Sequence, residues 1–309
     1  MSKIYVVGHK NPDNDSIMAA YTWANLKNMM DPDNEYLPVR LGPLPAESQM
    51  IFDEYGITDE VALIDSVGEG DKVYLVDHNE LGQAVDGLDK AEVVGVIDHH
   101  RIADLQTAAP IEFHNMPVGS TTSIITWIYG ACGIDIQDDI AACLLSAILT
   151  DTVIMKSPTC TSYDVDHINM LASQLGVDPT EFGMKIFKSR GGDDDVSVED
   201  ICNRDSKEFN FAGRKVWVAQ YETVDLEGMR NRIPEVSDQV AKICKEGGYD
   251  AALMLLTDII VEGSEFIAAG DVAFIEGGFD ISFANGSVWM PGVLSRKKQV
   301  AAVLADYAG

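Results

Sequence analysis

Basic side chains are scarce in this sequence. Its 309 residues include 22 Lys and Arg against 50 Asp and Glu, which gives a formal net charge of -28. Binding to a nucleic-acid backbone depends on Lys and Arg side chains that neutralise phosphates, so we do not expect a polynucleotide substrate. A heavily solvated surface accounts for most of this acidity, and a smaller share of it can hold metal ions.

Long apolar runs and paired cysteines are also missing. The longest apolar stretches, such as Ile4 to Val7 and Ala251 to Leu256, are far shorter than the roughly 20 residues that a membrane helix needs. The five cysteines form no C-x-x-C pair, which favours reduced thiols over disulfides or a zinc site. The N-terminus runs into a predicted strand without a signal-peptide cleavage site. We therefore expect a cytoplasmic protein with no membrane partner.

Length and pattern predict two α/β domains, because 309 residues exceed what one core usually supports. In the N-terminal part, short runs rich in Val and Ile alternate with helical stretches, which is typical of a parallel sheet. Glycines and a run of charges interrupt this pattern near residue 190. We predict a parallel-sheet domain at 1–189, a hinge linker at 190–195 and a smaller α/β domain at 196–309.

Three predicted strands of the first domain end in candidate metal ligands. In an open parallel sheet the carboxyl ends of the strands lie along one edge, so side chains far apart in sequence meet there. The three strand ends are Ile4 to Gly8 before His9, Val73 to Val76 before Asp77, and Glu92 to Ile97 before Asp98-His99-His100.

The first cluster combines a histidine with two aspartates. His9 is followed by Asp13 and Asp15, and the helical pattern Ile17 to Met30 comes next, with Asp15 or Ser16 as its predicted cap. Aspartates two residues apart can serve neighbouring ions. The alternative interpretation is a capped strand-to-helix turn whose His and Asp side chains are merely solvated.

The other clusters differ in how strongly they indicate a metal. Asp77 alone is a weak signal, because an acidic residue after a strand is commonly a helix cap. Adjacent imidazoles beside a carboxylate at a buried sheet edge, as in Asp98-His99-His100, are hard to explain structurally. Asp151 follows the helical run Ile140 to Leu149, where the helix dipole disfavours a negative charge. A metal ion or a Lys or Arg partner must offset that charge.

The order of these residues resembles the motifs of the DHH phosphoesterase superfamily: His9-x3-Asp13-x-Asp15, Asp77, Asp98-His99-His100 and Asp151. Within it the chain is similar to family II inorganic pyrophosphatases over nearly its whole length. Two segments resemble the C-terminal motifs of that family, namely Arg204-Asp205-Ser206-Lys207-Glu208-Phe209 and Ser295-Arg296-Lys297-Lys298-Gln299. The related exonucleases carry a glycine-rich motif with a histidine, which Gly277-Gly278-Phe279-Asp280 lacks. The short stretch from Asp98 to Asp151 has no regulatory insert, so we do not expect control by adenine nucleotides.

This resemblance implies hydrolysis of pyrophosphate to two phosphates, by in-line attack of a hydroxide held between two ions. It implies that His9 and Asp13 bind one ion, that Asp15, His99 and Asp151 bind the other, and that Asp77 bridges them. Asp98 would orient a histidine, and His100 would contact the substrate. Three cations of the C-terminal domain would bind the phosphates in a cleft that closes between the domains: Lys207, Arg296 and Lys297.

Imidazole and carboxylate ligands without a thiolate suit Mn²⁺, with Co²⁺ as a possible substitute, while Mg²⁺ can arrive with the substrate. The family resemblance also implies a homodimer through the N-terminal domain. Two other classes of function stay open. One is a DHH-type phosphodiesterase acting on short oligonucleotides or nucleotide phosphates, and the other is a catalytically silent module that binds metal or a partner.

Overall fold

The computed structural model describes residues 2–58, 61–190, 196–203, 205–283 and 286–309. The chain splits into two compact units, Met1–Arg190 and Gly191–Gly309, and each is described by itself. Of the predicted hinge linker at 190–195, only Arg190 belongs to the described residues. The domain limits inferred from the sequence therefore stay predictions.

The N-terminal unit is built on a six-stranded sheet in the order β3-β2-β1-β4-β5-β6. Every neighbouring pair of strands runs parallel, as the alternation of apolar runs and helices predicts. The chain builds outward from β1 to one side and then from β4 to the other, so the strand order reverses between them. The strands are β1 (Ser2–Lys10), β2 (Asn34–Leu41), β3 (Ala62–Leu63), β4 (Lys72–Val76), β5 (Glu92–Asp98) and β6 (Glu112–Asn115).

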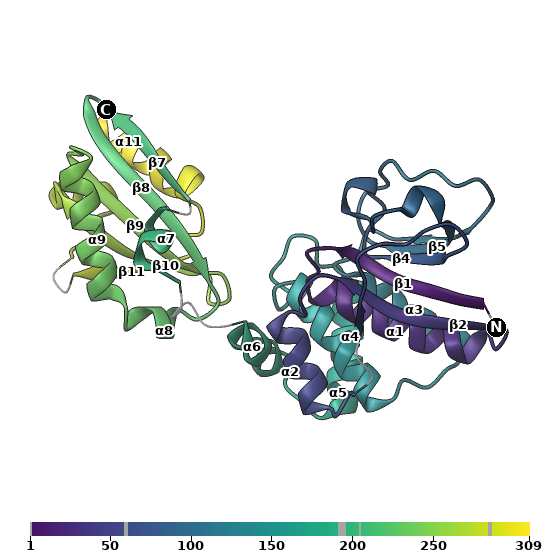
Figure 1. Cartoon of the computed structure of the whole chain (residues 1–309). Coiled ribbons are helices and arrows are strands. Elements are labelled where there is room, and N and C mark those ends of the chain that lie inside the picture. Colours follow the sequence, from purple (N-terminus) through teal and green to yellow (C-terminus); the bar gives the residue numbers. More distant parts are fainter. Residues whose placement is uncertain (1, 59–60, 191–195, 204, 284–285) are drawn as a thin grey trace. The chain divides into compact units, whose positions relative to one another are not determined.

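Helices pack on one face of this sheet, where Figure 1 shows α1, α3 and α4 together. The other face is covered by apolar residues near two short 3-10 turns, including Val85 and Leu88, which pack with Val7, Val73 and Val96 of the strands. The helices and turns of the unit are α1 (Asn14–Met30), α2 (Ala46–Glu54), α3 (Thr121–Cys132), α4 (Asp138–Asp151), α5 (Ser162–Leu175), α6 (Pro179–Ser189), η1 (Leu81–Gln83) and η2 (Leu88–Lys90).

Helix α1 begins earlier than its sequence pattern predicts. The expected cap, Asp15 or Ser16, is wrong: Asp13 is the N-cap, and its side chain accepts a hydrogen bond from the backbone N–H of Ser16 at 2.9 Å. This cap leaves the Asp15 carboxylate free for another task. Helix α4 likewise extends further than predicted, so that Asp151 is its last residue rather than the residue after it.

Helix α4 is buried, and hydrogen bonds join it to the start of α1. Its residues 140–150 are buried, as an almost continuously apolar run predicts. Asn14 at the start of α1 donates hydrogen bonds to Ser146 and Thr150 of α4 at 3.2 and 3.3 Å. The N-terminus of α1 is therefore fixed against the C-terminal half of α4, which brings the first and last candidate ligand clusters together.

The C-terminal unit has a mixed five-stranded sheet in the order β11-β10-β9-β8-β7, in which only the pair β8 and β9 is parallel. It is smaller than the first unit, and the predicted α/β class with a parallel N-terminal sheet is confirmed. The strands are β7 (Ser206–Phe211), β8 (Arg214–Thr223), β9 (Ala251–Asp258), β10 (Gly263–Gly270) and β11 (Ser287–Pro291).

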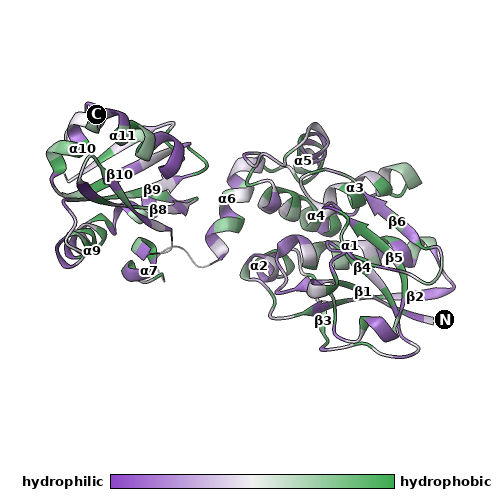
Figure 2. Cartoon of the chain, turned by 90° about the horizontal axis from the view of Figure 1, so that it is seen from above, coloured by the Kyte–Doolittle hydropathy of each residue, from purple (hydrophilic) through white to green (hydrophobic). Residues whose placement is uncertain are grey.

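Both faces of this second sheet are covered, which explains why all of β9 is buried. Helix α9 lays Val236, Val240 and Cys244 on one face at a spacing of four residues, and Figure 2 shows hydrophilic residues between its hydrophobic ones. The other face packs against α10 and α11. The helical segments are α7 (Val198–Asn203), α8 (Leu226–Arg230), α9 (Ile233–Glu246), α10 (Val272–Phe279), the π-helical turn η4 (Arg296–Ala301) and α11 (Ala302–Ala308).

Among the described residues, the structure contains no helix with the length and apolar character needed to cross a membrane.

The sheet makes one packing prediction at Gly95 of β5. A Cβ atom on Gly95 would lie 2.2 Å from Cε2 of the buried Tyr74 ring on the neighbouring strand β4. We expect Gly95→Ala to lower the free energy of unfolding of the N-terminal unit by about 1 to 3 kcal/mol, since overpacking forces the ring to move. Urea unfolding measures this change. The control is Gly130→Ala in α3, where an added Cβ meets nothing within 4 Å. Equal stability of the two variants would contradict the packing argument.

Candidate metal centre

The candidate ligands gather where the strand order of the N-terminal sheet reverses. In open parallel sheets this point, at the carboxyl ends of the strands, is where ligands bind. His9 lies near the end of β1, Asp77 follows β4, and Asp98 ends β5. The topology thus brings together three clusters that the sequence separates.

Asp77 is at the middle of this arrangement. One of its carboxylate oxygens, Oδ2, lies 3.4 Å from Nε2 of His9, and the other, Oδ1, lies 3.4 Å from Nε2 of His99. Its side chain is 1% exposed, and its φ of 62° is in the left-handed region that few non-glycine residues adopt. Glu80, not Asp77, is the N-cap of the following turn η1, so the helix-cap interpretation of Asp77 is excluded.

Three groups of ligand atoms meet around this residue, and Asp77 belongs to each. Atoms within a group lie within 4.8 Å of one another. Two ligands at about 2.1 Å from one divalent ion are about 3.0 to 3.4 Å apart, so histidine–carboxylate distances of 3.4 to 3.6 Å fit such an ion with little movement. The groups are His9, Asp13 and Asp77; Asp15, Asp77, His99 and Asp151; and Asp77, His99 and His100.

Backbone carbonyls set the orientation of His9 and His99, the two histidines whose Nε2 atoms face Asp77. Nδ1 of His9 lies 2.9 Å from the carbonyl oxygen of Lys10, and Nδ1 of His99 lies 2.9 Å from that of Val118. A carbonyl oxygen only accepts, so each Nδ1 must carry the hydrogen. The neutral ring then presents the lone pair of Nε2 to the carboxylates, which is the form that binds a metal.

His100 is held differently from its neighbour. The carboxylate of Asp98, which is completely buried, lies 2.9 Å from Nδ1 of His100 and also accepts a hydrogen bond from the His100 backbone N–H. Asn79 donates a further hydrogen bond to Asp98. The His100 side chain remains 55% exposed. Asp98 therefore orients the imidazole of His100.

The charges of the centre are unbalanced without a cation. Burial and the neighbouring charge of Asp15 raise the pKa of both Asp77 and Asp151 well above the ordinary value of an aspartate. Burial alone would lower the pKa of His9, but its hydrogen bonds to Asp13 and Asp77 outweigh burial and raise it to about 11. A proton on His9 thus occupies the place that a divalent cation would take.

Sequence reasoning missed two features beside the ligands. The first is the segment Ser120–Thr122 at the start of α3, which contacts Asp15. The second is a left-handed turn directly after Asp151, in which Val153, Ile154 and Met155 have φ values of 48°, 50° and 64°. Such angles are costly for β-branched residues, and no residue pattern signals them. Packing of Ile154 against Gly183 of α6 accompanies this turn.

The predicted substrate cations lie in the C-terminal unit. Arg296 begins the turn η4, and its backbone N–H donates to Oε1 of Gln220 at 3.0 Å. Its guanidinium donates to the Asp205 carbonyl at 2.6 Å and lies 2.8 Å from the Asp205 carboxylate. Lys207 on β7 and Lys297 in η4 are exposed. Asp205, Lys207 and Arg296 belong to the two segments that the sequence singled out.

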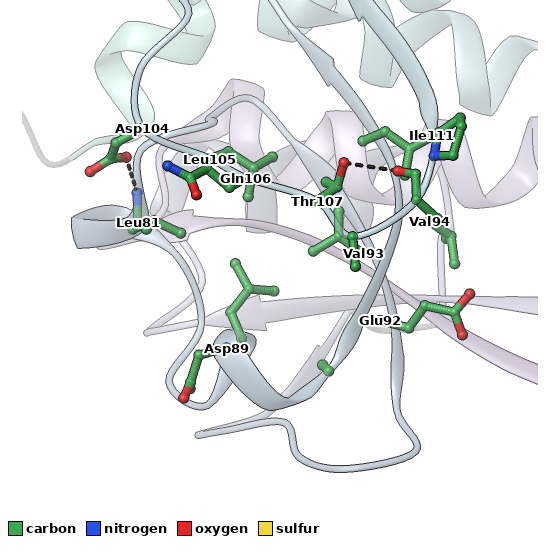
Figure 3. A pocket seen from close by; sticks show the side chains of 15 residues that line it. Leu81, Asp89, Glu92, Val93, Val94, Asp104, Leu105, Gln106, Thr107 and Ile111 are labelled. Atoms are coloured by element: carbon green, nitrogen blue, oxygen red, sulfur yellow. Dashed lines mark hydrogen bonds between the residues drawn. The ribbon is translucent and has the colours of Figure 1, made fainter.

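A cavity of about 590 Å³ lies elsewhere in the N-terminal unit, between β5 and the segment 104–111. In Figure 3 the Asp104 side chain accepts a hydrogen bond from the Leu81 backbone, and apolar side chains such as Val93 and Ile111 line the space. Its charged lining residues are acidic: Asp89, Glu92 and Asp104. None of the residues that line this cavity belongs to the candidate ligand groups, so the cluster around Asp77 remains the candidate centre.

Comparison with known proteins agrees with this geometry. The model of the DHH family N-terminal domain matches residues 3–148, and that of the DHHA2 domain matches residues 184–307. A probable manganese-dependent inorganic pyrophosphatase of Archaeoglobus fulgidus is 43% identical, with 96% of this chain and 95% of the relative covered. The manganese-dependent inorganic pyrophosphatase of Bacillus subtilis is 38% identical, with 99% of each chain covered.

A solved structure extends the likeness to three dimensions. The putative family II inorganic pyrophosphatase of Methanococcus jannaschii is 36% identical and has a TM-score of 0.60, with 99% of each chain covered. Sequence identity above one third over the full length, together with matches to both domain models, leaves one assignment. This chain belongs to the DHH family and, within it, to the family II, manganese-dependent inorganic pyrophosphatases.

Proposed function

We propose that this protein hydrolyses inorganic pyrophosphate to two phosphates at the centre around Asp77. The observation that carries the proposal is the position of the Asp77 carboxylate, which presents one oxygen to each of two histidines. One carboxylate between two ligand groups is the arrangement that a pair of ions needs for phosphoryl transfer. The relatives in Archaeoglobus fulgidus and Bacillus subtilis are named as manganese-dependent inorganic pyrophosphatases, which supports the same reaction.

The ligand groups support a division of the site between two ions. In this proposal His9 and Asp13 hold one ion, Asp77 is shared, and the other ion is held by Asp15, His99 and Asp151. Bound divalent ions would lower the pKa of a water molecule and draw charge from the phosphoryl oxygens. The mixture of imidazole and carboxylate favours Mn²⁺, with Co²⁺ as a substitute, whereas Mg²⁺ would come with pyrophosphate.

The protein's own residues would bind and orient the substrate. The hydrogen bond from Nδ1 to Asp98 raises the pKa of His100, and in its protonated form His100 offers Nε2 as a hydrogen-bond donor to a phosphate oxygen. Lys207, Arg296 and Lys297 supply positive charge in a chain that has little of it. Arg296 is the most defined of these cations, because Gln220 and Asp205 fix its backbone and its guanidinium. Its planar fork matches two phosphate oxygens at once.

We propose in addition a cytoplasmic homodimer that assembles through the N-terminal domain and binds no nucleic acid. These points rest on the family resemblance and on the net charge of -28. Sedimentation of the purified chain measures the assembly directly.

The first prediction concerns the metal requirement. Treatment with a chelator should abolish the release of phosphate from pyrophosphate, and Mn²⁺ or Co²⁺ should restore more activity than Mg²⁺ alone, because imidazole ligands favour these ions. Phosphate release after each metal is added back measures the effect. A preparation shown to be metal-free that still hydrolyses pyrophosphate at the full rate would rule out this mechanism.

A second prediction follows from the pKa of His9, which is raised to about 11 in the metal-free protein. An ion at Nε2 must displace the proton that His9 holds at neutral pH. Mn²⁺ binding should therefore release protons, and its apparent affinity should rise with pH between pH 6 and 8, by up to about tenfold per pH unit for each proton released. Calorimetry in two buffers of different ionisation enthalpy counts the protons.

The matched variants for this measurement each replace a histidine that faces a carboxylate. His9→Asn should lower the number of protons released on Mn²⁺ binding, whereas His114→Asn, which removes a histidine paired with Glu112 at 2.9 Å, should not. A binding heat that is independent of the buffer would contradict the assignment of His9 as a ligand.

A third prediction separates pyrophosphate from nucleotide substrates. Arg296→Lys should reduce kcat/KM for pyrophosphate about tenfold or more, which corresponds to about 1.4 kcal/mol of transition-state stabilisation, since lysine cannot copy the guanidinium fork. Mn²⁺ affinity should be unchanged. The control is Arg214→Lys, where the arginine contacts Asp271 and the Phe274 ring instead.

The contrary result would favour the phosphodiesterase. The unmodified protein would then cleave short oligonucleotides faster than pyrophosphate, and Arg296→Lys would leave pyrophosphate hydrolysis unchanged. Arg296 would in that case not bind the phosphates of pyrophosphate. A protein that binds Mn²⁺ but cleaves neither substrate would be the silent module instead.

A further inference from the structure

The candidate ligand Asp15 is held by a segment that the mechanism does not use. Its side chain is completely buried, and both of its oxygens accept hydrogen bonds from the start of α3. Oδ1 accepts from Ser120 Oγ at 2.6 Å and from Thr122 Oγ1 at 2.8 Å, while Oδ2 accepts from the Thr121 backbone N–H at 2.7 Å. We call residues 120–122 the hydroxyl segment.

The same segment reaches a second candidate ligand. Thr121 Oγ1 donates to Oδ1 of Asp77 at 2.9 Å. Three consecutive hydroxyl side chains therefore contact two carboxylates, Asp15 in the first turn of α1 and Asp77 after β4, which lie more than 40 residues away in sequence. Thr121 contributes to both, because its backbone holds Asp15 and its side chain holds Asp77.

Capping of α3 explains only part of these contacts. Ser120 is the N-cap, and its own Oγ accepts a hydrogen bond from the Thr122 N–H at 3.1 Å. Asp15 adds to this cap, because it accepts hydrogen bonds from the backbone N–H groups of Thr121 at 2.7 Å and Thr122 at 3.2 Å. The hydroxyl group of Thr121 plays no part in that cap and donates to Asp77, whereas the hydroxyl group of Thr122 contacts both Ser120 Oγ and Asp15.

A buried carboxylate outside the ligand set anchors the hydroxyl segment from both ends. Asp164 of α5 is completely buried and accepts hydrogen bonds from the Gly119 backbone N–H at 2.9 Å and from the Ser123 side chain. It also accepts from the N–H and Oγ1 of Thr161, both at 2.7 Å. The residues just before and just after the segment are therefore fixed to α5.

We propose that the hydroxyl segment, anchored by Asp164, is a positioning device that fixes the orientation of Asp15 and Asp77 before a metal ion arrives. In this arrangement Oδ1 of Asp15 accepts hydrogen bonds from the hydroxyl groups of Ser120 and Thr122. Oδ2 accepts from a single backbone donor, so it would be the oxygen that binds an ion. This inference rests on the metal centre of the proposed function, but it can be tested without pyrophosphate.

The test is a titration of the metal-stripped full chain with Mn²⁺. The electron paramagnetic resonance signal of free Mn²⁺ measures how much of the ion stays unbound. Thr122→Val keeps the shape of the side chain and removes the hydroxyl donor to Asp15. It should weaken the binding of one Mn²⁺ by about tenfold or more, the usual effect of losing a group that orients a ligand. Thr122→Ser, which retains the hydroxyl, should bind Mn²⁺ within about threefold of the unmodified protein.

The matched control lies one turn further along the same helix. Thr126 is also buried, but its Oγ1 donates to the Thr122 carbonyl at 2.8 Å rather than to a ligand. Thr126→Val should leave Mn²⁺ affinity unchanged even if it lowers the Tm. Thr121→Val provides a second, independent variant through Asp77, and keeps the test decisive if Thr122→Val does not fold.

Equal Mn²⁺ affinity of Thr122→Val and Thr126→Val, or tighter binding by Thr122→Val, would overturn the positioning role alone. If Thr122→Val does not fold, unchanged affinity of Thr121→Val would do the same. Absence of Mn²⁺ binding by the unmodified protein would overturn the metal centre itself and this inference with it. Weaker binding by the Val variants, with rescue by Thr122→Ser, supports the proposal.

Discussion

Crowding of carboxylates is the constraint on which the N-terminal unit depends. Asp13, Asp15, Asp77 and Asp151 bring oxygens into overlapping groups around one point, and two of them have a strongly raised pKa because they are buried beside a like charge. Like charges at this distance repel strongly away from bulk water. Hydrogen-bond donors and a protonated His9 offset this repulsion in part, and divalent ions bound there would replace repulsion with ligation.

The fold supplies those donors and the rigidity to hold them. Parallel strands deliver His9, Asp77 and His99 to one edge, and carbonyl groups fix the ring orientation of both histidines. Buried α4 carries Asp151 at its end, and Asn14 ties that helix to α1. The left-handed turn after Asp151 and the positive φ of Asp77 place local strain at the centre, where well-packed surroundings maintain it.

Much of this could be predicted because the chemistry lies in local patterns. Val-rich runs ending in His or Asp indicated both the parallel sheet and the edge at which the side chains meet. The family followed from motif order. The roles of His9, Asp13, Asp15, Asp77, His99 and Asp151 as ligands stay a proposal, although the fold does bring their ligand atoms together. The cap of α1 was misplaced, because Asp13, Asp15 and Ser16 have similar capping preferences and only the tertiary contact of Asp15 decides among them.

By itself, then, the sequence determined the fold class of the N-terminal domain, the family, and the set of side chains able to ligate metal, since these depend on periodicity and residue type. Only the tertiary structure decided how those side chains are held. Contacts such as those of Thr121 and Thr122 with Asp15, or of Asp164 with Gly119 and Ser123, join residues 41 to 107 positions apart. No periodicity links such pairs, because hydroxyl side chains are common on helices and their partners depend on how the helices pack against the sheet.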